Sequence, residues 1–249
     1  MARFFVDFLP VEGTSYTLSG ANADHAKVLR LRPGETVTLC DGAGSESKCT
    51  VQKGLTLLVG ATFPSPAETR NAASVYLAFP KGDKAEHVIQ KATELGAAEI
   101  CLFPSRYCVS RPEGKALEKK LERWQKIARS AAEQSGRGII PSVRAVDSYR
   151  EALAQAGAAE LPLLFYENEE QLSLRRALAD RTAPARGAGA SEPLRISLMT
   201  GAEGGFSEEE ILQAREVGLR ICTLGPRILR CETAPLAALS AVLYALGDL

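Results

Sequence analysis

The feature that most constrains the fold is a regular alternation of strand-like and helix-like segments that begins near Ser74. An apolar run at 75–80 predicts a buried strand, and the segment 84–95 predicts a helix that Gly96 would close as a C-terminal cap residue. The alternation continues to the end of the chain. Strands that alternate with helices favour a mostly parallel sheet, so we predict an α/β fold for residues 71–249.

Later segments follow the same pattern. Apolar residues at 115–134 recur at intervals of three and four, which predicts a long amphipathic helix that carries Trp124. Further strands are predicted at 99–103, 161–166 and 194–200. A final Ala- and Leu-rich helix at 234–246 would bury one face in the core or against a second subunit. Residues 182–193, rich in Ala, Gly and Pro, are predicted to form a flexible loop.

In the first seventy residues, polar and apolar residues alternate with the two-residue period of strands. Alternating polar and apolar residues predict a β-hairpin and a third strand, at 35–40, 47–51 and 55–63. A short helix at 25–32 is expected to stop at Pro33 and Gly34. Residues 1–70 are therefore predicted to form a small β-barrel with one helical insertion, which ends near the prolines Pro64 and Pro66.

Composition excludes several classes of protein. Six cysteines occur without a Cys-x-x-Cys pair and there are only two histidines, so we expect no metal site and reduced thiols. The N-terminus lacks the apolar core of a signal peptide, and no apolar run approaches the roughly twenty residues that span a bilayer. Thirty basic and thirty acidic residues cancel, which by itself neither favours nor excludes nucleic acid. We expect a cytoplasmic protein without membrane contact.

A glycine-rich turn at 201–205 lies between a predicted strand and a predicted helix. Ser207 and Glu210 have the spacing of a capping box, so a helix is expected to begin there and to leave several backbone amides free before it. The turn lacks the Gly-Lys-Ser/Thr of a phosphate-binding loop. Glu203 would repel phosphates, which indicates a neutral or cationic ligand. The alternative is that the glycines serve only the geometry of the turn.

A second turn, at 224–230, is unusually apolar. Ile228 and Leu229 lie between Arg227 and Arg230, directly after a predicted strand. Because a plain turn would be polar, we predict that this loop packs inside the protein and lines an apolar pocket for a ring. The alternative for the two arginines is that they only hold the loop in place.

The two turns and three further motifs resemble the RsmE family of SPOUT-class methyltransferases. The further motifs are Lys81-Gly82-Asp83-Lys84, the run from Gln90 to Gly96, and Ala132-Glu133-Gln134-Ser135-Gly136-Arg137. The resemblance extends over nearly the whole chain, including 25–32 and Gly34. One departure is Ala202, where the family usually has proline. Alanine would loosen the turn but removes no chemical group.

The resemblance implies an enzyme that methylates N3 of a uridine in bacterial 16S ribosomal RNA of the small subunit, with S-adenosylmethionine as donor. It implies a PUA-like RNA-binding domain at 1–70 and a SPOUT methyltransferase domain at 71–249, with a trefoil knot at about 198–245. It also implies a homodimer that acts on 16S ribosomal RNA or the small ribosomal subunit. Two other functions stay open, an RNA-binding protein that has lost its cofactor and a methylase of a ribose 2′-hydroxyl.

Site residues follow from the resemblance and from the turns. Cofactor binding is predicted for Leu198, Thr200, Gly201, Glu203, Gly204, Gly205, Leu224, Gly225, Arg227, Ile228, Leu229, Arg230 and Thr233. Arg230, Glu232 and Arg227 are the predicted catalytic residues. An arginine would stabilise the uracil anion or bind RNA phosphate, and Glu203 or Glu232 would position groups or remove the proton. RNA binding is predicted for Arg30, Arg32, Lys81, Lys84, Lys91, Arg106, Arg111 and Arg137, although each alone is an ordinary surface charge.

Overall fold

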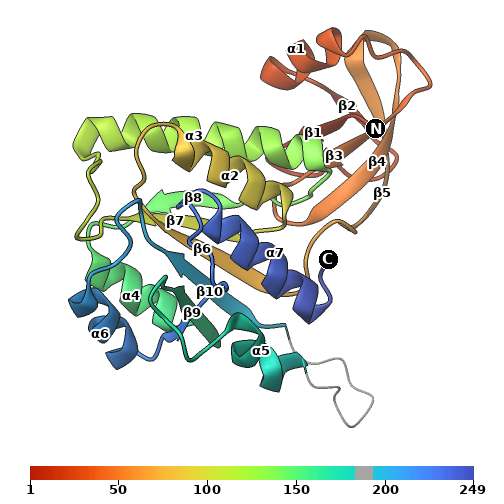
Figure 1. Ribbon diagram of the computed structural model, residues 1–249. Coiled ribbons are helices and arrows are strands. Elements are labelled where there is room, and N and C mark those ends of the chain that lie inside the picture. The colour runs from red at the N-terminus through yellow and green to blue at the C-terminus, as the bar shows by residue number, and fades with distance from the viewer. Residues whose placement is uncertain (183–192) are drawn as a thin grey trace. The chain divides into compact units, whose positions relative to one another are not determined.

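A computed structural model describes residues 1–182 and 193–249, and these divide into two compact units (Figure 1). The first unit comprises residues 1–68 and 129–140, and the second comprises 69–128 and 141–249. The flexible loop predicted at 182–193 lies almost wholly outside the described residues. The long helix α3 (Gly114–Ser135) contributes residues to both units.

The second unit is built on a six-stranded sheet with the order β11-β9-β10-β6-β7-β8. The strands are β6 (Ala72–Ala78), β7 (Glu99–Phe103), β8 (Ser142–Ala145), β9 (Leu161–Phe165), β10 (Arg195–Thr200) and β11 (Arg220–Cys222). Every neighbouring pair is parallel, which confirms the predicted α/β sheet. In the central strand β10, Leu198 lies between Val75 and Leu163, and all three side chains are fully buried.

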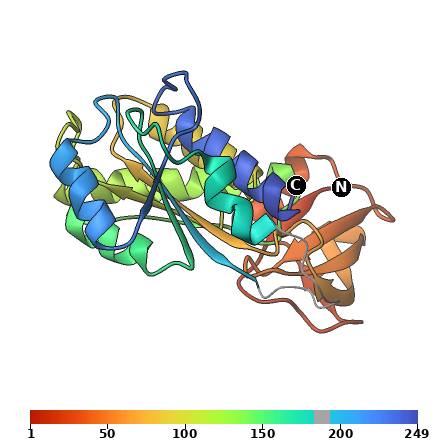
Figure 2. The same cartoon turned by 60° about the horizontal axis from the view of Figure 1, so that its bottom comes forward.

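Helices lie against this sheet (Figure 2), and most of the residues that they bury are apolar. They are α2 (Lys84–Glu94), α4 (Tyr149–Gly157), α5 (Leu174–Thr182), α6 (Glu208–Glu216) and α7 (Ala234–Leu246), in addition to α3. Helix α7 contacts α2, α5, β6 and β10, whereas α4 packs on β7 and β10. Gly96 has a φ of +101° and its amide bonds to Thr93, so it ends α2 as predicted.

The first unit is a five-stranded mixed sheet with the order β1-β3-β4-β5-β2. Its strands are β1 (Arg3–Phe5), β2 (Ser15–Thr17), β3 (Thr36–Cys40), β4 (Ser45–Val51) and β5 (Thr56–Pro64). A 3₁₀ turn (Lys53–Leu55) joins β4 to β5. The predicted hairpin and third strand are confirmed. The core of this sheet includes Phe4, Leu39 and Leu57, which are fully buried.

The helix predicted at 25–32 begins and ends earlier than expected, as α1 (Gly20–Val28). Its first turn contains only glycine, alanine and asparagine, so no large apolar side chain marks its start. It ends before Pro33 because Arg30 takes a left-handed φ of +53°.

Residues 129–140 complete the first unit through a buried ion pair. Arg137 Nη2 lies 2.7 Å from Glu68 Oε2, and the amides of Gly138 and Ile139 donate to the other Glu68 oxygen at 2.8 and 3.0 Å. Arg137 is only 3% exposed, so this predicted RNA-binding residue is not accessible to a phosphate. Its guanidinium instead holds the segment after α3 in place, because a buried charge requires a partner.

Candidate functional site

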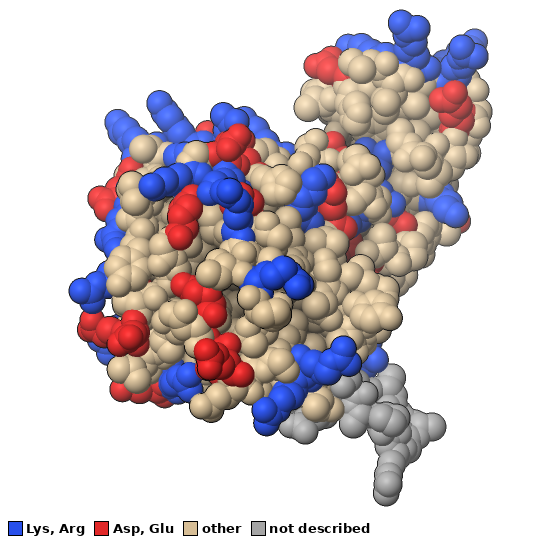
Figure 3. Space-filling view, viewed as in Figure 1, with Lys and Arg blue, Asp and Glu red and all other residues tan. Residues whose placement is uncertain are grey.

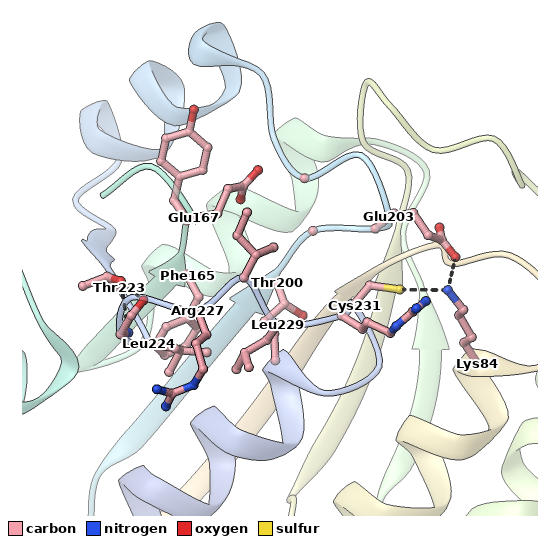
Figure 4. A pocket seen from close by; sticks show the side chains of 18 residues that line it. Lys84, Phe165, Glu167, Thr200, Glu203, Thr223, Leu224, Arg227, Leu229 and Cys231 are labelled. Carbon is pink, nitrogen blue, oxygen red and sulfur yellow. Dashed lines mark hydrogen bonds and ion pairs between the residues drawn. The ribbon is translucent and has the colours of Figure 1, made fainter. Parts of the chain in front are cut away.

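A cavity of about 290 Å³ lies where β9, β10 and β11 end (Figure 4). The carboxyl ends of parallel strands meet at one edge of the sheet, which is where open α/β sheets bind ligands. Both predicted loops contribute to the walls. The predicted cofactor-binding residues that line the cavity are Thr200, Gly201, Glu203, Gly205, Leu224, Gly225, Arg227, Ile228, Leu229 and Arg230, and Lys84, predicted for RNA binding, also lines it.

The glycine loop after β10 is folded tightly on itself. A Cβ atom on Gly201 would lie 2.9 Å from the Cα of Gly205, and one on Gly205 would lie 2.3 Å from Oε1 of Glu167. Gly205 also has a φ of +63°. Both positions therefore require glycine for close approach. Ala202 is buried at the turn, where its carbonyl accepts the Gly205 amide at 3.0 Å.

The helix that follows this loop starts as predicted. Ser207 accepts a bond from the amide of Glu210, and the Glu210 carboxylate accepts one from the amide of Ser207, which makes a complete capping box. The ring of Phe206 is buried and stacks on Phe103 at a centroid distance of 6.4 Å. The loop is thus anchored immediately beyond the cavity.

Lys84, at the start of α2, joins the two predicted loops. Its Nζ lies 2.9 Å from Glu203 Oε1 and 3.4 Å from Glu232 Oε2 (Figure 4 shows the first contact). The Lys81 amide donates to the same Glu203 oxygen at 3.0 Å. The Cys231 thiol donates to Glu232 at 3.2 Å. The sequence assigned Lys84 to RNA, but here it is an internal counter-ion for two loop carboxylates.

This cluster keeps both carboxylates ionised. Burial opposes ionisation of Glu203, but the bond from Lys84 and the backbone bonds outweigh it and lower the pKa of Glu203 to about 2. A backbone amide, the Cys231 thiol and Lys84 also lower the pKa of Glu232. Burial and the bond to Glu232 raise the pKa of Cys231 to about 12, so the thiol stays protonated. Carboxylates held in this way are weak proton acceptors.

The arginine-bearing loop differs from the prediction that it packs inside the protein. Ile228 is 84% exposed at the rim of the cavity, and Leu229 is only half-buried. The loop stands out because Gly225, with a φ of +108°, and Pro226 turn the chain away from the end of β11. Leu224 and Leu229 still supply an apolar wall.

The guanidinium groups of Arg227 and Arg230 are exposed and form no hydrogen bond or ion pair within the described residues. Neither group therefore clamps the loop in this structure. Glu167 likewise carries an unpaired charge, in this case a negative one. It lines the cavity and its carboxylate has no hydrogen-bond or ion-pair partner in the part of the chain that the structure describes.

Some predicted residues lie beside the cavity without lining it. Leu198 is buried in the sheet core, Gly204 packs against Tyr107, and Thr233 and Glu232 lie at the start of α7. Sequence reasoning missed seven lining residues, Phe165, Tyr166, Glu167, Ala202, Thr223, Cys231 and Ala234. The segment 165–167 directly follows a predicted parallel strand, and this position was the available signal.

The remaining predicted RNA-binding residues are mostly surface cations (Figure 3 shows one face). Lys91 pairs with Glu94, and Arg106 pairs with Glu209. Arg111 donates to two backbone carbonyls. Lys81 in the second unit and Arg30 and Arg32 in the first have exposed side chains.

Three properties concern the described residues as a whole. They contain no group of three or more His, Cys, Asp or Glu side chains that could hold a metal ion. All six cysteines are buried and free. None of the helices described is long and apolar enough to cross a membrane.

Comparison with known proteins gives consistent matches. Residues 67–243 match an RNA methyltransferase domain, and residues 18–56 match an RNA methyltransferase PUA domain. The chain is 35% identical to ribosomal RNA small subunit methyltransferase E of Bacillus subtilis, over 98% of this chain and 96% of that protein.

Two solved structures share the fold. Ribosomal RNA small subunit methyltransferase E of Neisseria gonorrhoeae, bound to S-adenosyl methionine, is 33% identical with a TM-score of 0.79, over 98% of this chain and 97% of that one. A methyltransferase of Legionella pneumophila in complex with the cofactor SAM is 28% identical with a TM-score of 0.79, over the same shares.

Proposed function

We propose that this chain, which belongs to the family of ribosomal RNA small subunit methyltransferase E proteins, methylates N3 of a uridine in 16S ribosomal RNA with S-adenosylmethionine as donor. The observation that carries the proposal is the cavity at the ends of β9, β10 and β11. Its walls combine apolar side chains, close-packed glycines and an unpaired carboxylate, in the fold in which the Neisseria relative binds S-adenosyl methionine.

The cavity residues fit such a donor. Gly201 and Gly205 bring bare backbone to the cavity wall, and Leu224 and Leu229 offer apolar contact to a ring. Glu167 supplies a carboxylate that pairs with no cation among the described residues, although Lys84, Arg227 and Arg230 line the same cavity. A sulfonium donor carries positive charge and no phosphate, so the Glu167 carboxylate and the apolar side chains suit it, while Lys84 in the same lining is already paired with Glu203 and Glu232.

When bound, S-adenosylmethionine supplies an electrophilic methyl group. The residues of this chain must then align the uracil and favour its N3 anion, because neutral N3 has no available lone pair. Arg230 and Arg227 are suited to this task because both guanidinium groups stand free at the cavity rim. Positive charge beside a uracil oxygen stabilises the anion and eases release of the N3 proton to water.

In this mechanism Glu203 and Glu232 hold the loops in place and do not accept the proton. Both bind Lys84 and both have lowered pKa values, so neither is a good proton acceptor. Their shared bond to Lys84 fixes the glycine loop against the segment that carries Arg230. The acceptor of the N3 proton is therefore water or a group other than these two carboxylates.

Further features of the proposal rest on family membership. They are a trefoil knot at about 198–245, a homodimer, RNA binding by the N-terminal PUA domain, and action in the cytoplasm on the RNA or the assembled small subunit. Exposed Arg30 and Arg32 on the first unit support a phosphate-binding role for that unit.

The test is mass spectrometry of nucleosides from unmethylated 16S ribosomal RNA incubated with the protein and isotopically labelled donor. We expect labelled N3-methyluridine. Label on a ribose 2′-hydroxyl would favour the alternative methylase. Absence of label, together with no binding of S-adenosylhomocysteine in calorimetry, would indicate an RNA-binding protein without catalysis. Arg230→Ala and Glu232→Ala test the site, and full activity in both would contradict the residue roles.

A further inference from the structure

The loop at 104–113 follows β7 and packs against the outer side of the glycine loop. A Cβ atom placed on Gly204 would lie 2.6 Å from the Cβ of Tyr107 and 3.3 Å from its Cγ. The neighbours of Gly204, which are Gly201, Glu203 and Gly205, line the donor cavity. Tyr107 is therefore separated from that cavity by the thickness of one backbone segment.

This loop is held in place by polar contacts although it contains no helix or strand. The Arg106 amide donates to Glu210 Oε1 at 2.7 Å. Arg111 Nη2 donates to the carbonyls of Ser105 and Arg106 at 2.6 and 3.1 Å, and the Ser105 hydroxyl lies 3.2 Å from the buried Cys108 thiol. A surface fixed in advance loses little conformational entropy when it binds a partner.

The fold uses only part of the Tyr107 side chain. The residue is 49% exposed, and its hydroxyl forms no hydrogen bond within the described chain. Of the two nearby arginines, Arg106 forms an exposed ion pair with Glu209 at 2.9 Å and Arg111 bonds the loop carbonyls, and Val109 beside the ring is 73% exposed. An exposed aromatic ring is a group on which proteins stack unpaired RNA bases.

We propose that loop 104–113 is a stacking platform for the target RNA, on which the ring of Tyr107 holds one unpaired base beside the donor cavity. The inference rests on the proposed function and extends it to the form of the substrate. N3 of uracil lies on the edge that pairs, so the target uridine must be unpaired and withdrawn from any helix before it reacts. A rigid ring next to the glycine loop stabilises such a displaced base or its neighbour.

The experiment measures binding and turnover separately in Tyr107→Ala, Tyr107→Phe and the control Leu212→Ala, which removes an exposed apolar side chain from α6. Affinity for a fluorescent 16S ribosomal RNA transcript is measured by anisotropy, and affinity for S-adenosylmethionine by calorimetry. We expect Tyr107→Ala to weaken RNA binding and raise the KM for RNA by roughly 5- to 100-fold, as for loss of one stacked base. Tyr107→Phe and the control should stay within about twofold, and donor affinity should not change.

Three results would overturn the platform. The stacking role is refuted if Tyr107→Ala binds RNA with an affinity within about twofold of wild type. Equal damage in Tyr107→Phe assigns the effect to the hydroxyl instead of the ring. A parallel fall in donor affinity makes Tyr107 a support for the glycine loop only. Because RNA binding is read without turnover, a wild-type protein that binds RNA but yields no methylated product would refute the proposed function and still test the platform.

Discussion

Replacing Gly205 with alanine tests whether the position of Glu167 governs donor binding. The added Cβ would lie 2.3 Å from Glu167 Oε1, whereas ordinary contact requires about 3.4 Å. The glutamate side chain is the more flexible partner, so its carboxylate must move by about 1 Å or more. The substitution also places a side chain at a φ of +63°.

Gly218→Ala is the matched control for backbone strain. Gly218 has a φ of +87°, and a Cβ there would meet nothing within 4 Å. Both variants should lose about 1–2 kcal/mol of unfolding free energy, because a left-handed conformation costs that much for a residue with a Cβ. Only Gly205→Ala should alter the cavity.

The expected effect on binding follows from the loss of one charged contact. Hydrogen bonds to charged groups contribute about 1.5–3 kcal/mol, and Glu167 is exposed, which favours the lower end of that range. The Kd for S-adenosylmethionine should therefore rise about tenfold in Gly205→Ala and stay within about twofold in Gly218→Ala. Isothermal titration calorimetry measures both values.

A double-mutant cycle with Glu167→Gln identifies the cause. If the alanine acts through Glu167, adding Gly205→Ala to Glu167→Gln should cost little further affinity. Glu167→Gln should also weaken the binding of S-adenosylmethionine more than the binding of S-adenosylhomocysteine, which lacks the sulfonium charge. Equal affinity in Gly205→Ala and Gly218→Ala, or fully additive losses in the cycle, would refute the reasoning.

Three other predictions concern charge. In Lys84→Met, the pKa of Glu203 should rise from about 2 toward 4.5. The wild-type protein should lose the stability that ionised Glu203 contributes as pH falls from about 4.5 to 2. Urea denaturation across this pH range should show a smaller loss of unfolding free energy in the variant. Glu68→Ala should destabilise the first unit by roughly 3–5 kcal/mol, because it leaves the buried Arg137 guanidinium without its carboxylate, while calorimetry should show unchanged donor binding in the second unit. RNA affinity should fall steeply between about 50 and 200 mM salt, and a flat response in filter binding would contradict phosphate contact by the surface cations.

Local pattern accounts for most of the fold that could be predicted. Strand β7 (Glu99–Phe103) and helix α7 (Ala234–Leu246) coincide with their predicted bounds. Both lie in segments where apolar periodicity, cap residues and turn chemistry agree. Helix α1 was misplaced because its first turn carries no large apolar side chain, and the turn after it depends on a left-handed Arg30.

Part of the site was also predictable from local sequence signals. Glycine, charge and turn signals at 201–205 and 224–230 identify two cavity walls, because these signals are local. The third wall at 165–167 has no distinctive residue type. It becomes a wall only because β9 lies between β10 and β11 in the sheet, and strand order is not written in any one segment.

The sequence by itself determined most of the helices and strands, the parallel sheet, the two loops and the family, but it gave no signal for the strands β1, β2 and β8. Only the tertiary structure decided which charges are free and which are paired. Lys84 meets Glu203 across 119 positions of the chain, Arg137 is buried against Glu68, and Arg227 and Arg230 remain open at the rim. The physical reason is that the state of a charge depends on burial and on partners distant in sequence, which are fixed when the sheet assembles.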